Sequence, residues 1–201
     1  QIDHMFGHVD MTAAGAAENR IYSETLHRLP HAAFAYTPPE NSQATGPLPA
    51  LLNGYLTFGF VGTLPRIGDT VLNSWARIMN KAANSRLIIQ ADGLHDAFVR
   101  QNFLDRARQA GIHIDRVTCQ GITPDKIRNT AIYDQIDIGL DPFPANNITA
   151  GCDMLWHGVP FVTLAGTMPS ARCGLGVLGD VGLDALAAET RNGYVQKAVL
   201  L

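Results

Sequence analysis

The chain has 201 residues, of which 46% are hydrophobic and 16% charged, a composition typical of globular proteins. It excludes collagen-like, disordered and disulfide-scaffold proteins. Fifteen Lys and Arg against 18 Asp and Glu give a formal net charge of −3, so no nucleic acid partner is expected, because too little positive charge is available to neutralise a phosphate backbone.

The cysteines Cys119, Cys152 and Cys173 show neither a paired nor a metal-ligand spacing, which favours a reducing compartment. No apolar run approaches the roughly 18 residues needed to span a bilayer, and no leader-like segment opens the chain. We therefore expect a cytoplasmic protein with no membrane partner. Because the chain starts at Gln1 and stops within a helix-like pattern, we expect it to be a piece of a longer protein.

The first 53 residues predict one helix followed by a linker. Apolar residues recur at helical spacing over Glu18–Leu29, and Pro30 ends the pattern. His4 and His8 lie four residues apart, but without a third ligand they fit a surface pair better than a metal site. Four prolines among small and polar residues over Tyr36–Asn53 are typical of a linker.

After Gly54, short apolar runs alternate with segments of helical period. The predicted strands are Leu56–Val61, Arg86–Gln90, Arg116–Cys119, Ile136–Leu140 and Phe161–Leu164. The predicted helices are Thr70–Lys81, His95–Ala110, Pro124–Ile132 and Ala150–His157, with further helical stretches at Ser170–Leu178 and Thr190–Leu200. Strands joined by helical crossovers form a parallel sheet with helices on both faces, so an α/β, Rossmann-like fold is predicted.

In such a sheet, ligands bind beyond the carboxyl ends of the strands, where loops and helix N-termini converge. This rule selects the five loops that follow the predicted strands. The loop Asp141–Asp153 is the most informative, because it leads from a strand into a helix start. Thr149 could cap that helix, whose free amides would suit a phosphate or diphosphate. Asp153, one turn further, could accept hydrogen bonds from ribose hydroxyls. Alternatively, Thr149 is only an N-cap and Asp153 only complements the helix dipole.

Cationic side chains occur in three of these loops. Arg66 follows the first strand and Lys126 opens the helix after the third. Together they could neutralise a diphosphate whose charge rises as it departs. Arg172 follows the fifth strand. The alternative for each is a solvated surface charge.

One motif argues against a dinucleotide enzyme. The run GLGVLG at Gly174–Gly179 matches G-x-G-x-x-G, but it does not leave a strand directly, as the dinucleotide fingerprint must. No G-x-x-x-x-G-K-[ST] sequence supports a P-loop. Neither a Ser-His-Asp nor a Cys-His arrangement can be assembled, and His157 fits a packing residue at a helix end.

The order and spacing of several segments resemble the C-terminal catalytic lobe of the O-linked N-acetylglucosamine transferases and SPINDLY-like protein glycosyltransferases. The segments are Leu64–Leu87, Ile136–Pro144, Thr149–Gly166 and the final GYVQKAVLL, with Tyr22–Phe34 resembling the end of the first catalytic lobe. The resemblance implies a GT-B arrangement, in which residues 1–53 end the first lobe and form a linker, and residues 54–201 form the nucleotide-sugar-binding lobe. It also implies a tetratricopeptide array and a first lobe upstream.

The resemblance assigns roles by position. Arg66 stands at a lysine that contacts the donor diphosphate and is our candidate catalytic residue, with Thr63 as a polar neighbour. Lys126 matches a lysine beside the nucleoside. Thr149 matches a diphosphate-binding threonine, and Asp153 the aspartate that holds the ribose.

The sequence also departs from the family pattern. Ile148 and Ala150 remove two hydrogen-bond donors around Thr149, and Asn129 replaces a histidine expected near the nucleoside. Arg66 keeps the charge of lysine but not its shape. Asn129, Asn147, Ala150 and Arg172 complete the predicted substrate-binding set.

The resemblance implies an inverting, metal-independent transfer of N-acetylglucosamine from UDP-N-acetylglucosamine to Ser or Thr of an acceptor protein, with no cofactor besides the donor. No general base can be named from these residues. A GDP-fucose-dependent O-fucosyltransferase and an Asn-directed glycosyltransferase are alternatives. A non-catalytic nucleotide-binding or interaction lobe is an alternative of another class.

Overall fold

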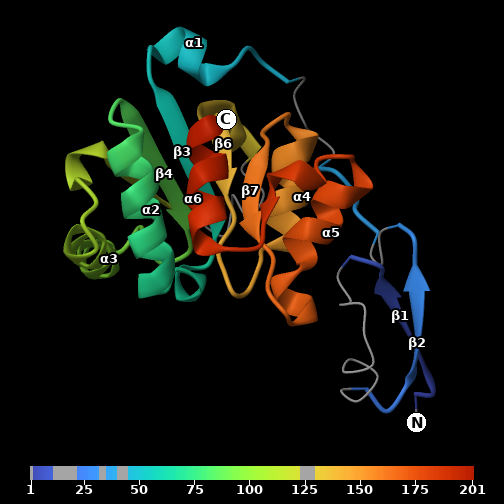
Figure 1. Ribbon diagram of the computed structural model, residues 1–201. Coiled ribbons are helices and arrows are strands. Elements are labelled where there is room, and N and C mark those ends of the chain that lie inside the picture. Colours follow the sequence, from blue (N-terminus) through green and yellow to red (C-terminus); the bar gives the residue numbers. More distant parts are fainter. Residues whose placement is uncertain (1, 11–21, 32–34, 40–44, 123–129) are drawn as a thin grey trace.

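The computed structural model describes residues 2–10, 22–31, 35–39, 45–122 and 130–201. Two short parallel strands, β1 (His4–His8) and β2 (Thr25–Leu29), pair with each other and project from the main body (Figure 1). A larger sheet forms the centre of that body. Its strands are β3 (Leu56–Gly62), β4 (Ser85–Ala91), β5 (Val117–Gly121), β6 (Ile138–Leu140), β7 (Phe161–Leu164) and β8 (Ala187–Ala188).

All the neighbouring strands of this sheet are parallel, in the order β5-β4-β3-β6-β7-β8. The connecting α-helices are α1 (Pro49–Asn53), α2 (Asp69–Lys81), α3 (Ala97–Gln109), α4 (Ile148–Trp156), α5 (Cys173–Asp180) and α6 (Arg191–Leu200). Short 3-10 turns occupy Leu64–Arg66, Ile114–Arg116, Thr130–Gln135, Pro169–Ala171 and Asp184–Leu186. No helix within the described ranges is long and apolar enough to cross a membrane.

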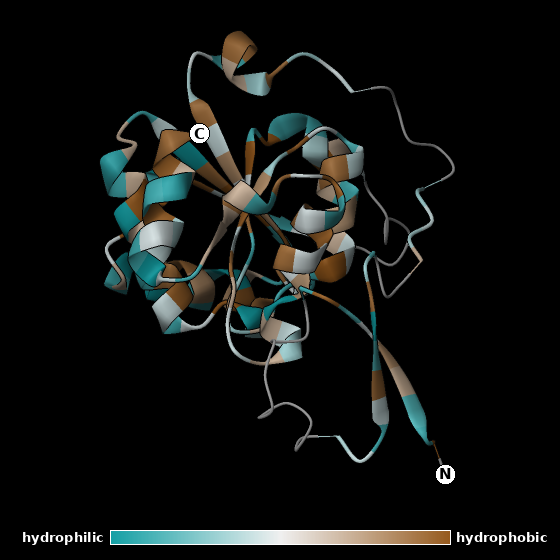
Figure 2. Ribbon diagram, turned by 45° about the vertical axis from the view of Figure 1, so that its right-hand side comes forward, coloured by the Kyte–Doolittle hydropathy of each residue, from teal (hydrophilic) through white to brown (hydrophobic). Residues whose placement is uncertain are grey.

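Strand alternation builds a core on each face of the sheet. In β7, Val162 belongs to the core that includes residues of α2, α3 and α6, whereas its neighbour Phe161 belongs to the core that includes residues of α4 and α5. Residues two apart on one strand share a face, and Phe58 and Phe60 of β3 accordingly lie in the same core. Hydrophobic residues dominate the central strands in Figure 2. The predicted parallel sheet with helices on both faces is therefore confirmed.

The order of the strands reverses direction beside β3. From β3 the chain adds β4 and β5 on one side, and then returns to place β6 and β7 on the other. A switch point therefore lies between β3 and β6. At such a point the loops after adjacent strands diverge and leave a crevice at the carboxyl edge of the sheet.

The predicted helix over Glu18–Leu29 is wrong at its C-terminal end. Residues 25–29 form β2, which pairs in register with β1 from His4 opposite Thr25 to His8 opposite Leu29. Such a short apolar pattern fits either period, and here pairing with a distant strand decides. Residues 18–21 lie outside the described residues.

The predicted linker over Tyr36–Asn53 is only partly irregular. Residues 35–39 carry no helix or strand, but Pro49–Asn53 form α1. Pro49 occupies the first turn of this helix and Gly54 follows with φ 73°, the left-handed conformation that commonly ends helices. The helix predicted over Pro124–Ile132 falls largely outside the described residues, and residues 130–135 form a 3-10 turn instead.

Contacts made by His8 and by Asp10 join the small sheet and the residues after β1 to the large domain. The buried His8 contacts Asp180 of α5, with 3.0 Å between Nε2 and Oδ1. The Arg172 Nε donates to the backbone carbonyl of Asp10 at 2.7 Å. His8 is therefore not part of the surface pair predicted with His4, whose ring instead lies 2.9 Å from His27 between nitrogens.

Candidate functional site

A pocket of about 160 Å³ opens at the switch point. The ends of β3 and β4 form one side, the 3-10 turn Thr130–Gln135 another, and the first turns of α4 a third. The lining residues are Val61, Gly62, Gln90, Ile122, Thr130, Tyr133, Asn147, Thr149, Ala150 and Asp153. Four predicted site residues thus come together here: Asn147, Thr149, Ala150 and Asp153.

Asn147, not Thr149, is the N-cap of α4. Its backbone is extended and its Oδ1 faces the amide of Ala150 at 3.5 Å, whereas Thr149 lies inside the first turn and is exposed. The Asn147 Nδ2 donates to the carbonyl of Val61 at 2.9 Å, which ties the helix start to the end of β3. The first amides of a helix have no partner within it. Those of α4 are therefore held at the rim of the pocket.

Asp141 fixes this helix start through a hydrogen bond from the backbone. One of its oxygens accepts from the backbone amide of Asn147 at 2.9 Å, and the other from the hydroxyl of Thr163 at 2.6 Å. Burial raises the pKa of the Asp141 carboxyl to about 6, although these hydrogen bonds and the charge of Arg66 oppose the shift. Asp141 organises the loop and does not line the pocket.

Asp153 is 7% exposed and faces the pocket from the second turn of α4. Its Oδ1 accepts a hydrogen bond of 2.6 Å from the hydroxyl of Tyr36, and its Oδ2 lies 3.5 Å from the hydroxyl of Tyr133. The Tyr133 ring in turn stacks on His157 at the end of α4, with ring centroids 5.1 Å apart. His157 is thus a packing residue, as predicted from its place at a helix end.

Arg66 lies beside the site without lining the pocket. It ends the 3-10 turn after β3, and its half-buried side chain donates through Nη1 to the carbonyls of Ala145 and Asn146, at 3.1 and 2.7 Å. Thr63, at the N-cap of the same turn, is exposed and its side chain makes no capping hydrogen bond. The guanidinium charge is therefore held against the loop that enters α4.

Arg172 is not among the residues that line the pocket. Arg172 donates to the carbonyls of Asp10 and Gly166, on the side facing the small sheet. Lys126 and Asn129 lie outside the described residues.

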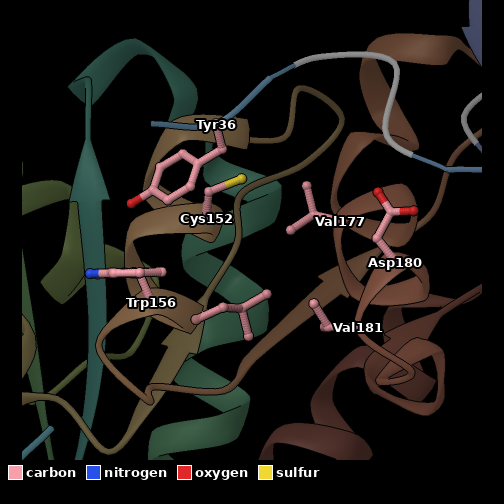
Figure 3. A pocket seen from close by; sticks show the side chains of 7 residues that line it. Tyr36, Cys152, Trp156, Val177, Asp180 and Val181 are labelled. Atoms are coloured by element: carbon pink, nitrogen blue, oxygen red, sulfur yellow. The ribbon is translucent and has the colours of Figure 1, made fainter. Parts of the chain in front are cut away.

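A second pocket, of about 280 Å³, lies on the side of α4 that faces α5 (Figure 3). It is a mostly apolar groove between α4 and α5, lined by Tyr36, Cys152, Leu155, Trp156, Val177, Asp180 and Val181. Tyr36 reaches Asp153 from this groove. Burial raises the pKa of Cys152 to about 11, so its thiol stays protonated near neutral pH.

The model of glycosyl transferase family 41 matches residues 48–201. The chain belongs to glycosyl transferase family 41. This assignment agrees with the resemblance seen in the sequence, and it makes the chain part of a family of glycosyltransferases.

Curated relatives include the Arabidopsis thaliana protein named "Probable UDP-N-acetylglucosamine--peptide N-acetylglucosaminyltransferase SPINDLY", 37% identical over 176 residues, which covers 88% of this family 41 chain and 19% of that protein. The tomato (Solanum lycopersicum) protein of the same name is 36% identical over 178 residues, covering 89% and 19%. The family 41 chain therefore spans about a fifth of the length of these relatives.

A solved structure supports the fold. A variant of the Thermobaculum terrenum O-GlcNAc transferase superposes on the family 41 chain with a TM-score of 0.87 and 29% identity, covering 98% of this chain and 36% of that one. The predicted C-terminal lobe of a GT-B glycosyltransferase is thus confirmed as a fold class.

Sequence reasoning missed several residues in and around this pocket. Gln90 lies at the end of β4, one residue before the loop that the sheet rule selected, so a wider window would have found it. Ile122 follows β5 inside a selected loop, but its apolar side chain gave no reason to single it out. Tyr36 carried no signal, and Asp141 stood only as the first residue of a selected loop, because the roles of both depend on contacts across the fold. Among the described residues, no three His, Cys, Asp or Glu side chains group as a metal site would require.

Proposed function

We propose that the pocket at the switch point binds the nucleoside diphosphate of a UDP-sugar, and that the protein containing this lobe transfers N-acetylglucosamine to Ser or Thr of an acceptor protein. One observation carries the proposal. In a family 41 chain, a helix N-terminus, a buried carboxylate and an arginine-bearing loop converge at the crevice where a Rossmann-like sheet binds its ligand.

Different described residues bind different parts of the donor. The amides of the first turn of α4 and the hydroxyl of Thr149 bind the diphosphate, because anions are stabilised at helix N-termini. Ala150 contributes its backbone and Asn147 holds the helix start in place. Asp153 accepts hydrogen bonds from the ribose. Arg66 and Thr63 stand beside the diphosphate, on the turn after β3.

The chemistry needs charge stabilisation more than bond-making by the protein. The acceptor hydroxyl oxygen attacks the anomeric carbon from the side opposite the diphosphate, and the bond from that carbon to the diphosphate oxygen breaks, which inverts the configuration. The hydroxyl proton leaves to water. Negative charge grows on the departing diphosphate. A fixed guanidinium and helix amides stabilise that charge without reorganising, and removal of one such donor typically costs about 10²- to 10³-fold in rate.

Further roles rest on the resemblance alone. Lys126 and Asn129 would lie beside the nucleoside, and Arg172 would reach the donor only if it exchanged its bonds with Asp10 and Gly166. The acceptor protein, the upstream tetratricopeptide array, the cytoplasmic location and metal-independent transfer stay predictions.

Calorimetric titration of the chain with UDP, UDP-N-acetylglucosamine, GDP and GDP-fucose tests the donor site. We expect UDP to bind and Asp153→Asn, which keeps the shape of the side chain, to weaken binding at least tenfold. The exposed Asp184→Asn is the matched control. Binding should be unchanged in EDTA.

The same titration separates the alternatives. Preference for GDP would select the fucosyltransferase, and absence of binding by every nucleotide would favour an interaction lobe, for which the missing donors at Ile148 and Ala150 argue. Either result overturns the proposal. Ser or Thr transfer is separated from Asn transfer by mass spectrometry of acceptor peptides treated with the full-length protein.

A further inference from the structure

The contact between Tyr36 and Asp153 joins two distant parts of the chain. Tyr36 belongs to residues 35–39, which precede the large sheet, whereas Asp153 lies in the middle of α4. Their oxygens are 2.6 Å apart. This is the short distance characteristic of a hydroxyl that donates to an ionised carboxylate, a bond about twice as strong as one between neutral groups.

The two oxygens of Asp153 have different surroundings. Oδ1 is held by Tyr36, which lines the apolar groove between α4 and α5 and not the nucleotide pocket. Oδ2 is nearest to Tyr133, which lines the nucleotide pocket together with Asp153. At 3.5 Å the Tyr133 contact is too long for a strong hydrogen bond. Tyr36 therefore holds the carboxylate from behind, and Oδ2 is the oxygen on the pocket side.

We propose that Tyr36 is a positioning residue for nucleotide binding: its hydroxyl fixes the rotamer of Asp153 so that Oδ2 faces the ribose. The inference rests on the proposed function and adds to it a residue outside the Rossmann-like lobe. Without the hydroxyl, the carboxylate loses its strong fixed partner and turns among several orientations. Binding the ribose must then also restrict that rotation, and affinity falls.

Alternatively, Tyr36 could compete with the ribose for Asp153, and its substitution would then raise the affinity for the nucleotide. If the Tyr36 hydroxyl occupied the place of a ribose hydroxyl, binding would have to displace it, and its removal would tighten binding. The groove side from which Tyr36 approaches favours positioning. A single substitution therefore distinguishes the two roles by the direction of the change.

The experiment measures the affinity of the 201-residue chain for UDP and for 2′,3′-dideoxyuridine diphosphate, which lacks the ribose hydroxyls that Asp153 would bind. Tyr36→Phe keeps the ring in the groove and removes only the hydroxyl. We expect it to lower the affinity for UDP about tenfold and the affinity for the dideoxy nucleotide less than twofold. Tyr55→Phe, at the opposite end of β3 and stacked on Arg86, should change neither.

The ratio of the two affinities does not depend on the fraction of folded protein, so it can be read even if Tyr36→Phe lowers stability. Equal weakening of both nucleotides would indicate a merely structural role, and unchanged or tighter UDP binding would also overturn the inference. If the wild type binds UDP through Asp153 while Tyr36→Phe has no effect, only this inference fails. If the wild type binds no UDP, the proposed function fails with it.

Discussion

The Nη1 of Arg66 lies 2.7 Å from the carbonyl oxygen of Asn146, so the turn that follows β3 is bound to the loop that enters α4. These segments follow adjacent strands of the sheet, β3 and β6. The bond therefore spans the switch point and fixes a positive charge beside the first turn of α4. It also gives Arg66 a structural task beside the proposed electrostatic one.

Replacement of Arg66 separates these two tasks. We expect Arg66→Met to lower the affinity for UDP by about ten- to a hundredfold, the usual range for hydrogen bonds to charged groups. The weak binding of uridine should be unchanged, because uridine has no phosphate. Arg66→Lys should retain most of the affinity, since lysine keeps the charge. Isothermal titration with both ligands measures the difference.

Arg77→Met is the matched control for Arg66. Arg77 is an exposed arginine of α2 that donates to Asn192, away from the pocket. An equal loss of uridine and UDP affinity in Arg66→Met would contradict the electrostatic role and assign Arg66 to the loop alone.

The buried Asp141 predicts a dependence of stability on pH. Burial raises the pKa of its carboxyl from 3.8 to about 6, so between these values the folded state keeps a proton that the unfolded state releases. The free energy of unfolding should therefore fall as pH rises from about 4 to 6 and level off above, by on the order of 2 to 3 kcal/mol.

Urea unfolding of the wild type and Asp141→Asn at several pH values from 4 to 8 isolates this contribution, because the other carboxyls are common to both proteins. The difference between their free energies of unfolding should change with pH only below about 6. Parallel pH profiles would show that Asp141 does not titrate in this range.

Close packing predicts that Gly174 tolerates no side chain. A Cβ at this position would meet the Thr163 hydroxyl and would lie 2.7 Å from Oδ2 of Asp141. We expect Gly174→Ala to lower the free energy of unfolding by about 2 kcal/mol, the usual cost of overpacking. Gly46→Ala, where a Cβ would find no atom within 4 Å, should be close to neutral. Urea denaturation of both variants checks this, and equal stabilities would argue against the steric conflict.

Gly174 also shows what the sequence could and could not tell. The GLGVLG run matches the dinucleotide fingerprint in spacing, but no strand leads directly into it, as predicted, and Gly174–Gly179 lie inside α5. The reason for a glycine at position 174 is its approach to Thr163 and Asp141. No pattern within the run reveals that approach, because both neighbours are distant in sequence.

The same division holds for the site. Hydrophobic periodicity found the five main strands and the helices α2, α3 and α4 between them. The sheet rule then placed Thr149 and Asp153 at one edge. Which residue caps α4 was missed by two positions, because the extended backbone at Asn147 decides it. Asp141 and Asp153 are the same residue type, so the sequence does not distinguish their roles. Only the fold shows that Asp141 binds the amide of Asn147 and that Asp153 lines the pocket.

The reversal of strand order beside β3 has a consequence for folding. Val61 and Gln90 lie on β3 and β4, whereas Asn147 and Asp153 lie at the start and in the second turn of α4, which follows β6, so a ligand in the crevice contacts both halves of the domain at once. A partly assembled sheet does not form the complete binding site. Occupancy therefore favours only the finished domain, and nucleotide should raise the melting temperature of the entire sheet as one cooperative unit rather than protect a single loop.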